Sequence, residues 1–148
     1  MKLSEIRNEL VADHAALRHE ATHIEAEVQR ILAGEPSLTE LRAAMDRFAG
    51  RLATHNHHEE SMLREELRNI DAWGPQREAF MDEEHAAEHA DIARALTDSG
   101  RLSDPIEVAR RVRATVERVI EHMRREEKEI LHPDVLRDDV VTIMGASE

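Results

Sequence analysis

Three histidines and two glutamates fall within six consecutive residues of this sequence, His55-Asn56-His57-His58-Glu59-Glu60. His55 and Glu59 are four residues apart, so on an α-helix they project from one face, about 40° apart around the axis. Apolar residues surround them at steps of three and four, the pattern of a helix face packed against a core. That row consists of Met45, Phe48, Leu52, His55, Glu59 and Met62. Burying an unpaired carboxylate costs several kcal/mol, so the pair needs a partner, and a metal ion provides one.

Histidines and glutamates also replace apolar residues on three other predicted helix faces. The seven candidate metal ligands are His14, His55, Glu59, His85, His89, His122 and Glu126. Imidazoles combined with carboxylates suit first-row transition metals such as iron, whereas calcium and magnesium prefer all-oxygen sites. Seven ligands exceed what one ion takes, so the set predicts two metal ions bridged by the two carboxylates. Such an arrangement leaves one coordination position open, where a small ligand binds.

Four long helices must position these ligands, because apolar residues recur at steps of three or four along four stretches. The stretches are roughly 3–31, 38–70, 81–98 and 105–130. Glycine- and proline-containing segments separate them at 34–36, 74–75 and 99–105, and His132-Pro133 follows the last one. With short connections this order predicts an all-α fold, an up-down-up-down four-helix bundle, followed by a short C-terminal helical segment between Asp134 and Met144.

Capping signals mark two of the expected helix starts. Ser37 followed by Glu40 has the spacing of a capping box. Asp104 directly before Pro105 indicates an N-cap followed by proline in the first turn.

The positions of the histidines around the turns test this topology. His14 lies 21 residues before Glu35 and His55 lies 20 residues after it, so antiparallel neighbours bring both histidines to one level. In the second hairpin, His89 is 9 residues before Asp98, but His122 is 17 residues after Pro105. A tight turn would offset these two sites by roughly 12 Å at 1.5 Å per residue. Either the third helix continues past Asp98, or part of 99–110 forms a longer connection.

Composition limits the classes of protein and partner. The chain of 148 residues is long enough for one domain, 1–148, with a sizeable core. Its formal net charge of −12 argues against a nucleic-acid backbone or an anionic membrane surface as a partner. Absence of cysteine excludes disulfides and thiolate metal sites. The expected protein is cytoplasmic, because neither a signal peptide nor a membrane-spanning apolar run is recognisable.

The order of these motifs resembles the hemerythrin-like, or HHE cation-binding, family. The matching pattern is a lone histidine, then His-x3-Glu, His-x3-His and His-x3-Glu, one motif on each predicted helix. Further similarity lies in Asp13-His14 with Leu17-Arg18, in His55 to Leu63, in Glu84 to Asp91 and in His122 to Pro133. Each piece alone is a weak signal, but four in the right order cover nearly the whole chain.

The resemblance implies an oxo- or hydroxo-bridged diiron centre inside a helical bundle. His85, His89 and His122 would bind one iron, and His14 and His55 the other. Glu59 and Glu126 would bridge them, and dioxygen or nitric oxide would bind at the second iron. Oxygen-carrying hemerythrins use instead an Asp five residues after the last histidine, which maps onto Glu127. Helical geometry favours Glu126, because Glu127 projects about 140° away from His122.

Other interpretations compete with this one. A single histidine on an apolar face is usually a hydrogen-bonded core residue, but five on four faces favour a site. A ferritin-like Glu-x-x-His site has two matching spacings, Glu20 to His23 and Glu129 to His132. Glu20 lies off the predicted stripe, and His132 is at a helix end beside Pro133. His57, His58, Glu60 and Glu127 are expected to face solvent or to support the ligands from outside, as are Glu88 and Asp91.

Three functional classes remain open at this level. The favoured one is a module for carriage, storage or sensing of dioxygen or nitric oxide. A diiron redox enzyme would turn over peroxide or nitric oxide, or repair damaged iron centres. An iron store would carry out no reaction. The sequence does not identify a protein partner.

Overall fold

The computed structural model describes residues 2–69, 74–80, 82–83, 86–101 and 103–138, and the regular structure within these ranges is entirely helical. The helices are α1 (Leu3–Leu32), α2 (Leu38–His58), η1 (Glu59–Leu63), α3 (Arg64–Asn69), α4 (Gly74–Phe80), α5 (Ala86–Arg101) and α6 (Pro105–Glu129). The candidate ligand His85 lies outside the described residues. The all-α prediction is confirmed for the part of the chain that is described.

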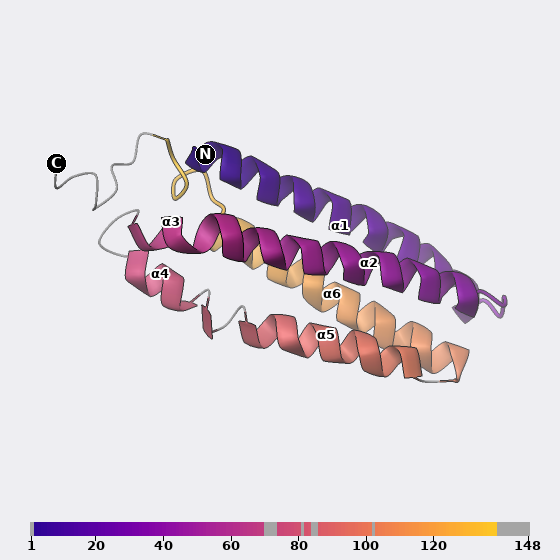
Figure 1. Ribbon diagram of the computed structural model, residues 1–148. Helices are drawn as coiled ribbons and strands as arrows, with labels where there is room; N and C mark the ends of the chain where they lie inside the picture. Colours follow the sequence, from indigo (N-terminus) through magenta and orange to yellow (C-terminus); the bar gives the residue numbers. More distant parts are fainter. Residues whose placement is uncertain (1, 70–73, 81, 84–85, 102, 139–148) are drawn as a thin grey trace, which may run out of the picture.

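The long helices lie side by side (Figure 1). α1 packs against α2 and α6, while α5 packs against α6 and α2. The helices are more numerous than the four expected, because α2, η1 and α3 follow one another directly and α4 precedes α5. Each long helix therefore packs against two other long helices, and its apolar face contributes to a core shared with them.

Local sequence explains where most of these helices start and stop. α1 ends in a Schellman motif: Gly34 has φ 92°, and the amide of Glu35 donates to the carbonyl of Arg30 at 2.9 Å. α6 begins at the predicted cap, where the Asp104 carboxylate accepts a hydrogen bond from the Ile106 amide at 3.1 Å. The predicted helix start at Ser37 is confirmed, because Ser37 is the N-cap of α2, but the capping box is not, since Ser37 makes no side-chain hydrogen bond there.

The third predicted helix runs further than its glycine suggested. α5 continues through Ser99 to Arg101, and the Ser99 hydroxyl donates to the carbonyl of Ala95 at 2.7 Å. With Pro105 starting α6, the connection is short. Of the two alternatives that the sequence left open, continuation of the helix past Asp98 is the one observed.

A π-helical turn, η1, interrupts the second long helix and includes Glu59 and Glu60, the last two residues of the motif that starts at His55. A π turn holds one more residue than an α-helical turn, so the positions that face the core after it are shifted by one residue. Leu63 and Leu67 are completely buried, whereas Met62 is only half-buried. The placement of Met62 on the core-facing row is therefore only partly right: Met62 packs against the edge of the core, whereas Leu63 lies inside it, because a strict α-helical period was assumed across a π turn.

Polar side chains divide the core into two apolar clusters. One cluster contains Leu17, Leu52, Val119 and their neighbours towards the α1–α2 turn. The other contains Leu10, Leu63 and Ile130 with residues near both chain ends. Between them lies a layer of almost fully buried polar residues, namely His14, His55, Glu59, His122 and Glu126.

The segment after α6 closes the second cluster. Leu136 is 1% exposed and packs in that cluster, and the Ser4 hydroxyl donates to Asp138 at 2.6 Å. Residues 130–138 form turns rather than a helix. The predicted C-terminal helical segment is thus wrong for its first part, 134–138, and its remainder lies outside the described residues.

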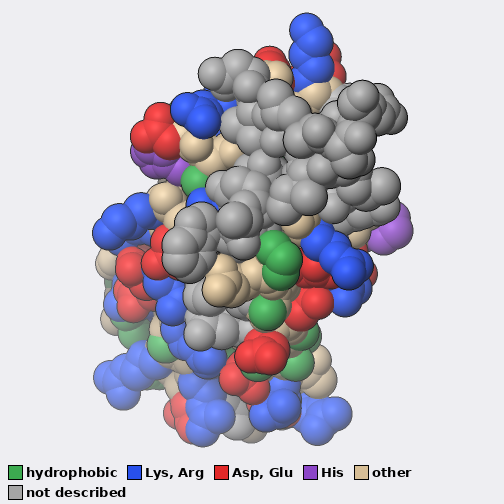
Figure 2. All heavy atoms as spheres, turned by 90° about the vertical axis from the view of Figure 1, so that its left-hand side faces the viewer, with side chains coloured by type: hydrophobic (Ala, Val, Ile, Leu, Met, Phe, Trp, Pro, Cys, Tyr) green, Lys and Arg blue, Asp and Glu red, His purple; other side chains and the backbone are tan. Residues whose placement is uncertain are grey.

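Acidic and basic side chains are interspersed on the end of the molecule that Figure 2 shows, with small hydrophobic areas between them. Among the described helices, none is both long and apolar enough to cross a membrane.

Candidate metal centre

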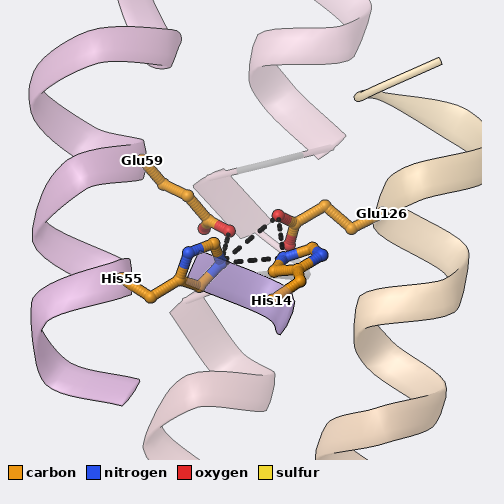
Figure 3. A group of neighbouring side chains, drawn as sticks. All are labelled: His14, His55, Glu59 and Glu126. Atoms are coloured by element: carbon orange, nitrogen blue, oxygen red, sulfur yellow. Dashed lines mark hydrogen bonds and ion pairs between the residues drawn. The ribbon is translucent and has the colours of Figure 1, made fainter. Parts of the chain in front are cut away.

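Four side chains from four helical elements point towards one another in the polar layer (Figure 3). α1 supplies His14, α2 supplies His55, η1 supplies Glu59 and α6 supplies Glu126. His14 Nε2 lies 3.1 Å from His55 Nε2, and His55 Nε2 lies 2.5 Å from Glu59 Oε1. The level predicted for the two histidines around the first turn is confirmed. All four donor atoms lie within 4.8 Å of one another, as a single small cation requires of its ligands.

The carboxylate of Glu126 reaches two groups of histidines. Its Oε1 lies 3.1 Å from His14 Nε2 and 3.4 Å from His55 Nε2. Its Oε2 lies 3.3 Å from Nε2 of His122, one turn earlier on α6. One oxygen therefore faces each side, which is the disposition of a bridging carboxylate.

The second side contains His122 and His89. Their ring centroids are 5.1 Å apart, and the rings meet edge to face. His89 Nε2 is buried. His85, the remaining predicted ligand, lies outside the described residues.

Carboxylates flank the outward-facing nitrogens of three inward-pointing histidines. His55 Nδ1 lies 3.2 Å from Asp13, and His14 Nδ1 lies 3.3 Å from Glu127. His122 Nδ1 is in contact with Glu88. In His55 and His122, an Nδ1–H that donates to the carboxylate leaves the lone pair of Nε2 pointing into the site, which is how proteins commonly orient metal-binding imidazoles. His14 Nδ1 lies within ion-pair distance of Glu127 but without hydrogen-bond geometry.

Arginine side chains form ion pairs with two of these outer carboxylates, Glu127 and Glu88. Arg18 pairs with both oxygens of Glu127 at 2.6 and 2.8 Å, and this pairing lowers the pKa of Glu127. For Glu88, burial raises the pKa, but contacts with His122 and Arg125 lower it below its ordinary value. Glu127 is therefore engaged from outside the layer, while Glu126 points into it.

The histidine His58 shares the Asp13 carboxylate with His55. Its Nδ1 lies 2.8 Å from Asp13 Oδ2, the same oxygen that His55 Nδ1 faces. His58 is about one-third exposed, so this contact links the buried layer to the surface.

Electrostatics inside the layer favour a positive charge there. Burial lowers the pKa of His55, but the carboxylates of Glu126 and Glu59 more than compensate and raise it to about 10. Burial opposes ionisation of Glu126, yet hydrogen bonds from its neighbours hold its pKa well below the ordinary value. The two carboxylates thus stabilise a positive charge at this position, here that of the His55 imidazolium. A metal cation would be stabilised in the same way, so the donor set fits a metal ion.

The ferritin-like spacings do not form sites. Glu20 is buried on the other side of α1, 3.3 Å from both Arg47 and Arg51, while His23 is exposed. At the end of α6, His132 Nδ1 accepts a hydrogen bond from the Asp134 amide.

Several supporting residues were found only partly from the sequence. The expectation that Glu88 orients an imidazole is confirmed, but Asp91 is exposed beside Arg94. Asp13, Arg18 and Arg125 were not singled out as supporting residues. A carboxylate directly before a core histidine is a usable signal for Asp13. Arg125 has no such local signal, because its contact depends on how α5 and α6 are rotated.

Comparison with known proteins gives one match. A family model described as "Hemerythrin HHE cation binding domain" matches residues 5–133. Searches of curated proteins and of solved structures find no significant match.

Proposed function

Because the chain belongs to the hemerythrin HHE cation-binding domain family, we propose that it holds two iron ions and binds a diatomic ligand, dioxygen or nitric oxide. In this proposal, residues 1–148 form one domain. Its helices make the four legs of an up-down-up-down bundle: α1, then α2 with η1 and α3, then α4 with α5, then α6. The role is carriage, storage or sensing of the ligand.

The division of the Glu126 oxygens between two histidine groups carries this proposal. His14 and His55 would hold one ion, and His85, His89 and His122 the other, with Glu59 and Glu126 between them. A mononuclear site would need only the four donors that converge in Figure 3. It would leave no role for Glu126 Oε2 facing His122.

Bound iron would supply an open coordination position for a small ligand. The chain's own residues prepare the site: Asp13, Glu127 and Glu88 keep the Nε2 atoms directed inwards. Apolar clusters above and below the layer limit the entry of water. A cavity of about 190 Å³ reaches Glu59 and His89 from the surface and is also lined by Asn56, Arg64 and Asp82. A diatomic ligand is small enough to enter it.

An optical experiment tests ligand binding directly. Iron-loaded protein is reduced once, exposed to dioxygen and then deoxygenated under inert gas without further reductant, and difference spectra are recorded through many cycles. We expect an absorption change that appears with dioxygen and reverses fully on its removal. Iron-loaded protein whose spectrum does not respond to dioxygen or nitric oxide would contradict the ligand-binding role.

Methionine oxidation separates a carrier from a redox enzyme. Met123, next to His122 in the chain, is 1% exposed, and Met62, within η1, is half-buried. A carrier that releases dioxygen intact leaves both thioethers unchanged by mass spectrometry, whereas reactive oxygen products convert methionine to its sulfoxide. Iron-dependent gain of oxygen at either position would favour the redox enzyme.

A further inference from the structure

A second pair of histidines lies on the outer surface of α1, away from the buried layer. His19 and His23 are one helical turn apart and both are exposed. Their Nε2 atoms are 3.3 Å apart, while their ring centroids are 4.8 Å apart. The two nitrogens therefore face each other across the turn.

This separation suits chelation of a metal ion. Zinc binds imidazole nitrogen at about 2.0–2.1 Å. An ion placed about 2.05 Å from both nitrogens would subtend an angle of about 107° between them, close to tetrahedral. Water can fill the remaining positions, because both rings are exposed.

Residues beside the pair leave this face open. Arg18 is directed towards α6, where it pairs with Glu127. Glu20 is directed towards α2, where Arg47 and Arg51 bind it. Neither neighbour of His19 thus competes for its imidazole. The formal net charge of −12 also raises the local concentration of cations around the molecule.

From this geometry we infer that His19 and His23 form a surface site for a divalent late first-row transition ion, of which zinc has the best-matched geometry. The site uses two imidazole nitrogens and water, and it is separate from the buried centre. Copper and nickel share the preference for imidazole and are alternative occupants of the same chelate.

Zinc titration of the full chain tests the inference. Calorimetric stoichiometry and affinity are measured for the original chain, for His19→Ala and for His23→Ala. Every variant retains the buried donors, so zinc bound in the buried centre is common to all and cancels in the comparison. We expect each single variant to lose one zinc ion per chain, whether or not the buried centre holds iron.

A matched control separates chelation from mere histidine content. The double variant His23→Ala with Ala26→His keeps two histidines on exposed positions but places them seven residues, roughly 10 Å, apart. We expect its surface binding to be weaker by about tenfold or more, because two separate imidazoles cannot chelate one ion. Circular dichroism confirms that each variant is folded. Unchanged zinc binding in either single variant, or full retention in the double variant, would overturn the inference.

Discussion

Glu126 and Glu127 are adjacent in the chain, yet their carboxylates have different partners. Glu126 lies between His14, His55 and His122, whereas Glu127 pairs with Arg18 and faces the outer nitrogen of His14. The two residues therefore act on a metal in different ways. In the proposed centre, Glu126 would bind the metal and Glu127 would orient a ligand.

This difference predicts unequal effects of the same substitution. Glu126→Gln removes a donor shared by both halves of the centre, so we expect at least one metal ion per chain to be lost. Glu127→Gln leaves the donors in place and should weaken binding by about 10–100-fold, the usual effect of removing a group that orients a ligand. Metal content after dialysis at a fixed free iron concentration provides the measurement. Equal loss in both variants, or greater loss at Glu127, would contradict the bridging role of Glu126.

At this scale the sequence predicts inward-pointing residues better than their outer partners. His14, His55, Glu59, His122 and Glu126 follow from the apolar period, and all five are buried. The contacts of Asp13 and Arg125 depend on the rotation of one helix against another. Apolar spacing within a single helix does not contain that information.

At the scale of secondary structure, the π turn η1 changes which residues enter the core. Leu63 is fully buried in the cluster with Leu10 and Ile130, whereas Met62 is half-buried beside it. A regular α-helix would have buried Met62 instead. The sequence did not reveal this change, because the residue types from Glu59 to Leu63 do not distinguish a π turn from an α-helical turn.

Paired truncations test the register set by η1. Leu63→Ala should lower the free energy of unfolding by about 2–5 kcal/mol, because it leaves a cavity in a packed cluster. Met62→Ala should lower it less, by about 1 kcal/mol, since that side chain is partly exposed at the edge of the cluster. Urea denaturation of metal-free protein measures both. A larger loss for Met62→Ala would indicate that the second long helix is α-helical throughout.

The molecule as a whole is built around a polar layer between two apolar clusters. Helix order and the level of His14 against His55 were predictable, because turn signals and residue counts set them. The level of α5 against α6 was not, because α5 continues past Ser99 to Arg101. A bundle of this kind is stable only if the charges of its layer are balanced, by protons or by metal.

Proton balance predicts how the stability of metal-free protein depends on pH. The pKa of His55 is raised to about 10 in the folded protein, above its ordinary value of about 6.5. Its contribution to stability is therefore complete below about pH 6.5 and is lost as the pH rises towards 10. Chelator-treated protein should unfold at lower urea concentration at pH 10 than at pH 6. The variant His55→Gln should show a smaller difference; an equal difference would assign the effect to other groups.

Iron anomalous diffraction tests the dinuclear centre most directly. Crystals of iron-loaded protein would give the number of ions per chain and the position of each relative to Glu126. The proposed function predicts two anomalous peaks in the polar layer, with one Glu126 oxygen towards each. A single peak among His14, His55, Glu59 and Glu126, with none near His89 and His122, would contradict it.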